Sequence, residues 1–346
     1  MQAMVRSIHA PLLRESVADD VDAHTAQLGD WKLQYDQLDC GTFHGRFTDV
    51  RWPGMQLFSE ETTRRVHQRG QLPANSIALA CVLAGEGDVY VAGRRQTADV
   101  TMAVHAADVD TCTPAGCVLA GLVFDSALLK DLDLPTAQVD HLLGTPRMFA
   151  LCLSAQQGAN LRALLRAALE TARQPAGIPA PQHLRDDLLL KAVEVLSQGL
   201  IDDHDTMRMR KNVVDCARDV LLASAHDLPS LIELSKRLGV SPRKLSYCFE
   251  DVLGISPARY VKMLRLNAVR RELRSVDSVG TTIYDVAARW GFWHFGHFSA
   301  DFKRMFAELP SETLRVGRSA SRARCKERAA TQEKGSHQPG AWQAAR

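Results

Sequence analysis

Two segments of this 346-residue chain repeat one pattern: a short amphipathic helix, a glycine turn and a second helix with polar side chains. The first copy spans 231–249 and turns at Gly239, and the second spans 283–306 and turns at Gly291. A helix-turn-helix of this kind places its second helix in the major groove of DNA. Two copies on one polypeptide therefore predict a transcription regulator that reads two grooves.

The first copy has local causes for its turn. Gly239 can adopt a left-handed conformation without a Cβ penalty, Ser241 is a good N-cap, and Pro242 suits the first helical position. Leu245 and Phe249 fall on one face, which should pack on the preceding helix. A plain helical hairpin with solvated basic residues is the alternative. In the helix-turn-helix interpretation, the outer face of the second helix carries Arg243, Lys244, Ser246 and Tyr247, which are predicted to contact DNA.

In the second copy, Thr281 or Thr282 can cap the leading helix. Phe298, Phe302 and Phe306 recur every four residues, which is typical of a helix face buried in a core. The exposed positions of the second helix are predicted to be Phe295, Gly296, His297, Ser299, Ala300, Lys303 and Arg304.

A helical segment is expected between the two copies, over 257–274. At 1.5 Å per residue this rod would be about 27 Å long. A rod of that length could hold two recognition helices near the spacing of about 34 Å between successive major grooves.

The whole stretch resembles the DNA-binding domain of AraC/XylS-type bacterial regulators over about 90 residues. The matching motifs are Arg237–Ser241, Arg265–Ala268, Trp290–Phe292, Phe298–Phe306 and Pro310–Ser311. The resemblance implies RNA polymerase as a partner of an activator. It also implies base contacts from Arg243, Ser246 and Tyr247 in the first copy, and from Phe295, Gly296, His297, Ser299 and Ala300 in the second.

One position departs from that pattern. Ala300 stands where an arginine is often found in the family. The second copy is therefore expected to contribute shape and phosphate contacts more than base readout.

The charge distribution agrees with DNA binding. Residues 229–346 hold 21 Lys and Arg against 11 Asp and Glu, a formal charge of +10, whereas 1–228 hold 21 against 29, a formal charge of −8. Basic surface binds phosphates through counterion release. The near-neutral total of +2 thus combines a basic module with an acidic one.

No run of about 18 apolar residues predicts a membrane span, and the N-terminus lacks the apolar core of a signal peptide. Eight cysteines are scattered without a CxxC pair, as expected for reduced thiols in the cytoplasm. Cys112 and Cys117 could form a redox pair, although packing as ordinary buried residues is favoured.

Residues 40–125 show short alternating runs separated by glycine and proline turns, which predicts a small β-barrel of the cupin-like kind or a β-sandwich. The pattern becomes helical from 159 onward. The stripe of Leu184, Leu188, Leu189, Ala192, Val195 and Leu196 could pack on the barrel or form a dimer seam.

The predicted fold class is α+β, with an N-terminal sensor and an all-α double helix-turn-helix domain. We expect a ligand-sensing and dimerising domain over 1–205, including a charged linker at 201–205, and a DNA-binding domain over 206–316. A basic, disordered tail is expected over 317–346, with nonspecific phosphate contacts.

Catalysis is not expected. The chain lacks the His-x-His pair of cupin metalloenzymes, and His44, His67 and His105 are interpreted as ordinary histidines. His294 and His297 could form half of a metal site, but groove contact is the better interpretation. No nucleophile elbow, zincin motif or phosphate-binding loop is present.

Residues 34–38 and 41–48, with 265–273 and 290–294, resemble regulators of ethanolamine-utilisation operons. The resemblance implies activation of a catabolic operon, with ethanolamine and adenosylcobalamin as effectors. Residues 140–144 miss the spacing of the cobalamin motif Asp-x-His-x-x-Gly by one, so cobalamin binding through that motif is not supported. An ammonium ligand would favour carboxylates and aromatic faces, for which Trp52, Tyr90 and Asp88 are candidates.

Overall fold

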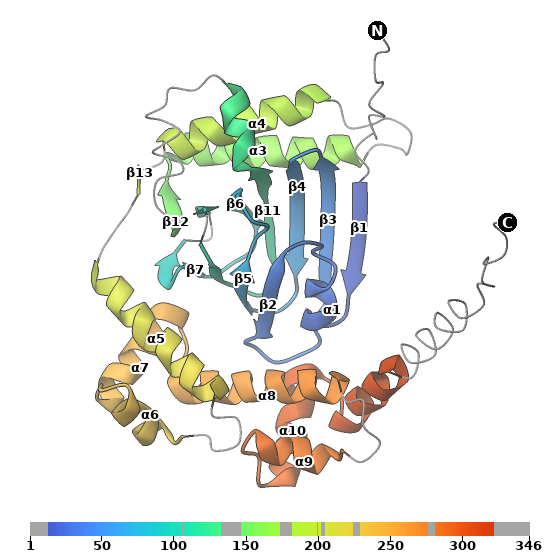
Figure 1. Ribbon diagram of the computed structural model, residues 1–346, viewed down its shortest axis with the longest axis vertical. Coiled ribbons are helices and arrows are strands. Elements are labelled where there is room, and N and C mark those ends of the chain that lie inside the picture. The colour runs from blue at the N-terminus through green and yellow to red at the C-terminus, as the bar shows by residue number, and fades with distance from the viewer. Residues whose placement is uncertain are drawn as a thin grey trace, which may run out of the picture. The chain divides into compact units, whose positions relative to one another are not determined.

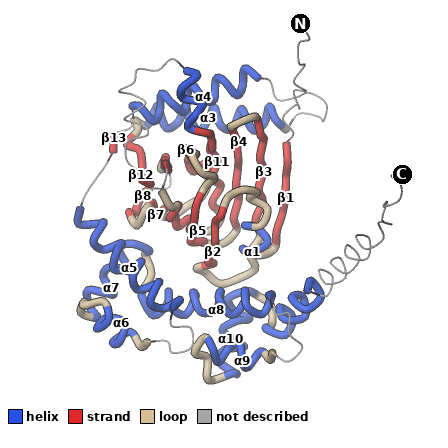
Figure 2. The backbone as a smooth tube through the Cα atoms, in the orientation of Figure 1, coloured by secondary structure: helices blue, strands red, loops and turns tan. Residues whose placement is uncertain are grey.

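The computed structural model describes residues 13–97, 99–105, 107–132, 147–173, 182–198, 200–201, 205–223, 229–275 and 281–321. Strands occupy the N-terminal part, and from α5 onward the described elements are helices (Figure 2). The strands are β1 (Leu13–Ala18), β2 (Lys32–Gln37), β3 (Gly45–Trp52), β4 (Met55–Thr62), β5 (Val66–Gln71), β6 (Ser76–Ala84), β7 (Val89–Val91), β8 (Arg94–Gln96), β9 (Thr101–His105), β10 (Val109–Thr113), β11 (Cys117–Asp125), β12 (Arg147–Cys152) and β13 (Leu200–Ile201). The helices are α1 (Val21–Thr25), the 3₁₀ helix η1 (Ser126–Leu132), α3 (Ala155–Ala172), α4 (Gln182–Gln198), α5 (Asp205–Ala223), α6 (Leu231–Arg237), α7 (Pro242–Leu253), α8 (Pro257–Ser275), α9 (Ile283–Arg289) and α10 (Phe295–Phe306).

The strands form two antiparallel sheets (Figure 1). The larger sheet has the order β1-β3-β4-β11-β6-β9-β12-β13, and the smaller has the order β2-β5-β10-β7-β8. No strand ladder joins the two sheets within the part of the chain that the structure describes. The structure therefore shows an antiparallel domain of two sheets that enclose a common core, as expected of a sandwich, and it does not show a closed barrel.

The larger sheet serves two cores because successive side chains point to opposite faces. On β11, Leu119 and Val123 face the smaller sheet, whereas Leu122 and Phe124 face α3 and α4. Those two helices lie next to each other on the far side of the sheet (Figure 1). One apolar layer thus fills the space between the sheets, and another fills the space beneath the helices.

The apolar stripe of α4 belongs to the second of these layers. Leu188, Leu189, Ala192, Val195 and Leu196 are buried there against the chain's own sheet and α3. Of the two roles predicted for this stripe, packing on the sheet is the one found. The stripe is therefore covered and not available as a dimer seam.

Cys112 and Cys117 are both buried and free. The Cys117 side chain lies in the core between the sheets, whereas the Cys112 thiol accepts a hydrogen bond from Arg65. Burial raises the pKa of Cys117 to about 12, so this thiol stays protonated. Both cysteines pack as ordinary buried residues and do not form a redox pair.

The predicted connector is a continuous helix, α8, with one helix-turn-helix on each side of it in the chain. A further helix covers residues 310–321. Gly317 allows this helix to approach α8 closely, since a Cβ at Gly317 would lie 2.4 Å from the carbonyl oxygen of Leu273. The predicted disordered tail therefore does not begin at 317, and residues 322–346 lie outside the described part.

Two compact units result from the packing, and their boundary falls within α8. The first comprises 1–223 and 229–263, and the second comprises 224–228 and 264–346. The first helix-turn-helix therefore belongs by its packing to the unit that contains the sheets. Most of the predicted linker at 201–205 lies outside the described residues.

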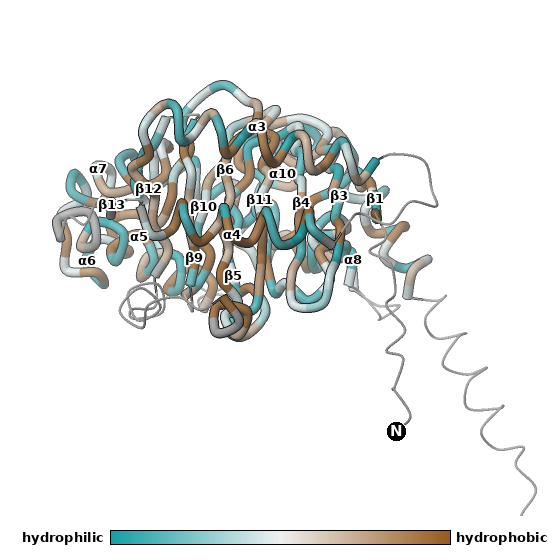
Figure 3. Tube along the Cα trace, turned by 90° about the horizontal axis from the view of Figure 1, so that it is seen from above, coloured by the Kyte–Doolittle hydropathy of each residue, from teal (hydrophilic) through white to brown (hydrophobic). Residues whose placement is uncertain are grey.

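Apolar and polar residues are interleaved along the described chain (Figure 3). None of the described helices is both long enough and apolar enough to cross a membrane.

Candidate nucleic-acid interface

The first helix-turn-helix consists of α6 and α7. Ser230 caps α6 in a capping box with Glu233, and Gly239 turns the chain with a φ of 64°. The Ser241 side chain then accepts a hydrogen bond of 3.1 Å from the backbone N–H of Lys244, with Pro242 at the first helical position. These are the turn and cap predicted from the sequence.

The two faces of α7 differ sharply. Leu245, Cys248, Phe249, Val252 and Leu253 are buried, as the apolar spacing predicts. The opposite face carries the four residues predicted to contact DNA: Arg243, Lys244 and Tyr247 are exposed, and Ser246 is half-buried. All four are thus brought together on one accessible face, and their contacts with bases stay a prediction.

Arg210 of α5 extends this face in a way the sequence did not reveal. Its guanidinium lies 4.7 Å from the centroid of the Tyr247 ring and 2.7 Å from the Asp251 carboxylate. The stacking orients Tyr247 beside a positive charge. Arg210 is separated from Tyr247 by an interhelical loop and α6, and no motif or spacing connects the two residues.

The second helix-turn-helix consists of α9 and α10. Thr282, one of the two predicted caps, forms a capping box with Asp285, and hydrogen bonds from Thr282 lower the pKa of Asp285. Gly291 makes the turn with a φ of 75°. The indole N–H of Trp290 donates to Glu272 of α8 over 2.8 Å, which fixes α9 against the connector.

On α10, Phe298, Phe302, Met305 and Phe306 are buried, in agreement with the predicted four-residue repeat. The predicted DNA-contacting residues occupy the other face: Phe295, Gly296, His297, Ala300 and Lys303 are exposed, and Ser299 is half-buried. The placement is compatible with groove contact, which no observation tests directly.

The rings of His294 and His297 lie 6.1 Å apart. Within the described residues, no group of three or more metal-binding side chains comes together, at this helix or elsewhere. His44 pairs with Asp19 on the surface, and His67 pairs with Asp110. These histidines are hydrogen-bonded to carboxylates, His44 at 2.8 Å and His67 at 2.8 Å.

Helix α5, which packs on α7, is attached to the smaller sheet by partly buried charges. The Lys211 ammonium of α5 lies 2.6 Å from both Asp110 on β10 and Asp215 on α5. Arg69 on β5 lies 2.9 Å from the same Asp215. Although burial alone would raise the pKa of Asp110, the His67 hydrogen bond and the charges of His67, Lys211 and Arg69 hold it far below its usual value.

A second contact lies at the end of α7. Gly254 ends the helix in the left-handed conformation, and a Cβ there would lie 2.3 Å from the Tyr90 hydroxyl. Arg65 of the sheet domain donates to the Leu253 carbonyl. The C-terminal end of α7 therefore packs directly on the sheet domain.

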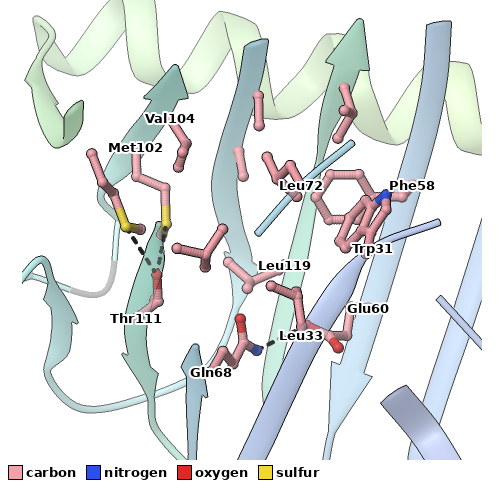
Figure 4. Close-up of a pocket in the computed structure, with 15 residues that line it drawn as sticks. Trp31, Leu33, Phe58, Glu60, Gln68, Leu72, Met102, Val104, Thr111 and Leu119 are labelled. Atoms are coloured by element: carbon pink, nitrogen blue, oxygen red, sulfur yellow. Dashed lines mark hydrogen bonds between the residues drawn. The ribbon is translucent and has the colours of Figure 1, made fainter. Parts of the chain in front are cut away.

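A cavity of about 50 Å³ lies between the two sheets (Figure 4). Its walls are apolar, with Trp31 and Phe58 on one side and Met102 and Met148 among the lining residues. One buried carboxylate, Glu60, closes it. The carboxylate accepts hydrogen bonds from Tyr35 at 2.7 Å and Gln68 at 2.9 Å, and it pairs with His24 at 2.8 Å.

The structure does not gather the three residues suggested from sequence as ammonium contacts. Trp52 is buried beneath the helices, on the far side of the larger sheet from this cavity. Tyr90 lies next to Arg65 and Gly254, and Asp88 pairs with Arg95. Glu60, Trp31 and Phe58 are the residues that combine a carboxylate with aromatic faces, and sequence reasoning missed them.

Residues 234–315 match the family model described as "Helix-turn-helix domain". The chain is 35% identical over 104 residues to the probable thc operon regulatory protein of Rhodococcus erythropolis, which covers 30% of this chain and 31% of that protein. It is also 35% identical over 86 residues to the XylDLEGF operon transcriptional activator of Pseudomonas putida. That match covers 25% of this chain and 27% of the activator.

Among solved structures, the chain resembles a regulator with an AraC-type DNA-binding domain from Chromobacterium violaceum, with 25% identity, a TM-score of 0.29, and coverage of 32% of this chain and 96% of that one. It also resembles the AraC-like transcriptional activator CuxR, with 13% identity, a TM-score of 0.40 and coverage of 75% and 96%. At these TM-scores the structural matches add nothing to the sequence matches.

The C-terminal part of the chain is a double helix-turn-helix DNA-binding domain. The relatives that match this part of the chain are described as a regulatory protein and a transcriptional activator. The matched region spans less than a third of the length of these two relatives.

Proposed function

We propose that this protein is a transcriptional activator that binds specific DNA sequences and responds to a small effector. The observation that carries the proposal is the pair of helix-turn-helix units, each with an exposed second helix, in a region of formal charge +10. The basic region supplies phosphate affinity, and the exposed helices supply base contacts. By its resemblance to catabolic regulators, the target would be a catabolic operon in the cytoplasm of a bacterium, and RNA polymerase would be its partner there.

A selection from random DNA with the full chain tests DNA recognition. We expect two preferred sequence blocks with centres about 10 base pairs apart. Each block would be bound by one of the second helices, α7 and α10, which are called the reading helices below. A single preferred block would show that the protein does not read two major grooves. The absence of any sequence preference would overturn the proposal. The oligomeric state on the selected DNA, measured by light scattering, shows whether a homodimer forms.

The cavity between the sheets is the proposed effector site. It is mainly apolar and is lined by one buried carboxylate, Glu60, which is the composition expected of a small-molecule site. Its wall strands β5 and β10 also hold α5: Gln68 faces the cavity, whereas Arg69 and Asp110 bond to α5. An effector that displaces these strands would therefore act on the first helix-turn-helix through α5, which packs on α7.

The chemistry of the cavity favours a small amine. A carboxylate attracts an ammonium group, and the faces of Trp31 and Phe58 can stabilise a cation. Ethanolamine, implied by the family resemblance, has only four non-hydrogen atoms and is small enough. Adenosylcobalamin is far larger than the cavity, so an effector role for it requires a different surface.

Thermal unfolding of the full chain with ethanolamine, other short amines and the matching alcohols tests the effector proposal. An amine at 100 times its Kd should stabilise the chain by about 2.7 kcal/mol. Glu60→Gln should weaken amine binding. Ala80→Leu should fill the cavity and so abolish amine binding, while the chain stays folded. If no amine raises the melting temperature, the effector proposal fails and the DNA-binding proposal stands.

A further inference from the structure

The second reading helix has an unusual chemical surface at its N-terminal end. Tyr284 of α9, Trp293 of the turn and Phe295 of α10 are exposed to 53%, 68% and 40% of their surface. The rings of Tyr284 and Phe295 lie 6.3 Å apart. These three side chains, called the aromatic patch below, are large apolar groups that the fold leaves exposed within the second unit.

The two reading helices, α7 and α10, carry different kinds of side chain at their N-terminal ends. The first turns of α7 present Arg243, Lys244 and Tyr247, which can donate hydrogen bonds. The first turns of α10 present Phe295, Gly296 and Ala300, and Lys303 is the first Lys or Arg of the helix. Histidine 297 is the polar group between them. Apolar contact is therefore the main interaction available to α10 at this end.

In a helix-turn-helix, the N-terminal residues of the second helix contact the edges of bases in the major groove. The apolar group that the major groove offers there is the C5-methyl of thymine. Gly296 lets DNA approach the helix backbone closely, because it has no side chain and open space surrounds it. The patch thus has the position and the chemistry of a thymine-reading surface.

We propose that the aromatic patch, through Trp293 and Phe295, selects thymine methyl groups in the DNA block bound by the second helix-turn-helix. The inference rests on the proposed DNA-binding function and adds the means of recognition. It predicts that the second block is rich in thymine, and that the first block is read by hydrogen bonds from α7. The two helices would then use different chemistry on one operator.

Replacement of thymine by deoxyuridine tests this directly, because deoxyuridine keeps the base pair and lacks only the methyl group. In the selected site, each thymine of each block is replaced in turn, and the Kd of the full chain is measured by fluorescence anisotropy. At one or more positions in the second block we expect the affinity to fall about fourfold, as for the loss of one buried methyl-sized group.

Variants locate the origin of that loss. In Trp293→Ala or Phe295→Ala, the thymine and deoxyuridine sites should bind with equal affinity at the position that the missing ring contacts. Tyr247→Ala, in the first unit, is the matched control and should leave the deoxyuridine effect in the second block unchanged. Because Phe295 also contacts the buried Phe298 ring at 5.7 Å, the more exposed Trp293 provides a variant with less risk to folding.

Three results would overturn the proposal while leaving sequence-specific binding intact. Deoxyuridine could be without effect throughout the second block, or its effect could persist unchanged in both alanine variants. The variants could also bind DNA normally but fail to activate transcription, which would assign the aromatic patch to a protein partner. Loss of all sequence preference in the unaltered chain would instead contradict the proposed function itself.

Discussion

Arg243 lies in the first turn of α7, exposed and on the same face as Lys244 and Tyr247. Its guanidinium can bond to a guanine edge through two parallel hydrogen bonds, which a phosphate contact would not require. We expect Arg243→Ala to weaken binding to the selected site by about 1–3 kcal/mol and to relax one base preference. Anisotropy titrations with selected and unrelated DNA separate the two roles, since an equal loss on both sequences would make Arg243 a phosphate contact.

Ser241 determines where the reading helix begins. Its side chain accepts from the N–H of Lys244 at 3.1 Å, an N–H that the helix itself cannot satisfy. Ser241→Ala should therefore destabilise the chain by about 1 kcal/mol, measured by urea unfolding. Ser241→Asp keeps a capping oxygen and should retain most of the stability. Equal losses in the two variants would mean that the cap contributes little.

At the scale of elements, the contact between α8 and the helix at 310–321 depends on one glycine. A Cβ at Gly317 would lie 2.4 Å from the Leu273 carbonyl oxygen, so Gly317→Ala forces the two helices apart. We expect a loss of roughly 1–3 kcal/mol in unfolding free energy. Gly296→Ala is the matched control because open space surrounds it, and in a helix it should stabilise by about 0.5–1 kcal/mol. A Gly317→Ala chain as stable as the unaltered one would contradict this packing.

At the scale of the molecule, the attachment of α5 to the smaller sheet should depend on pH. The folded chain holds the pKa of Asp110 far below its usual value, so the unfolded chain takes up a proton first on acidification. The stabilisation is fully present above the ordinary aspartate pKa of about 3.9 and is lost as the pH falls below it.

Comparison with Asp110→Asn isolates this contribution. The variant leaves buried positive charge without one of its partners, so it should be less stable by up to about 3–5 kcal/mol at neutral pH. Urea unfolding from pH 6 to pH 3 should show this difference shrinking below about pH 4. Asp88→Asn, at an exposed pair with Arg95, is the control that should show little difference at any pH. A difference for Asp110→Asn that stays constant with pH would refute the linkage.

Strands that lie between two apolar cores are recognisable in the sequence, and strands covered by ion pairs are not. Apolar side chains occupy both faces of β6 and β11, which contribute to both cores. By contrast, β5 and β10 carry charged and polar residues that include His67, Arg69 and Asp110. Their outer face is buried, but beneath ion pairs to α5 and not beneath apolar side chains. Hydrophobic periodicity does not detect burial of that kind.

The two helix-turn-helix units, their caps and turns, and the face of each reading helix follow from the sequence alone. Those features depend on interactions within a few residues: glycine at the turns, Ser241 and Thr282 as caps, and apolar residues four apart. Only the tertiary structure decided what α4 packs on, which residues enclose Glu60, and that α5 is held to the smaller sheet. These contacts join residues far apart in the chain, such as Asp110 and Lys211, and the local pattern around either residue carries no information about its partner.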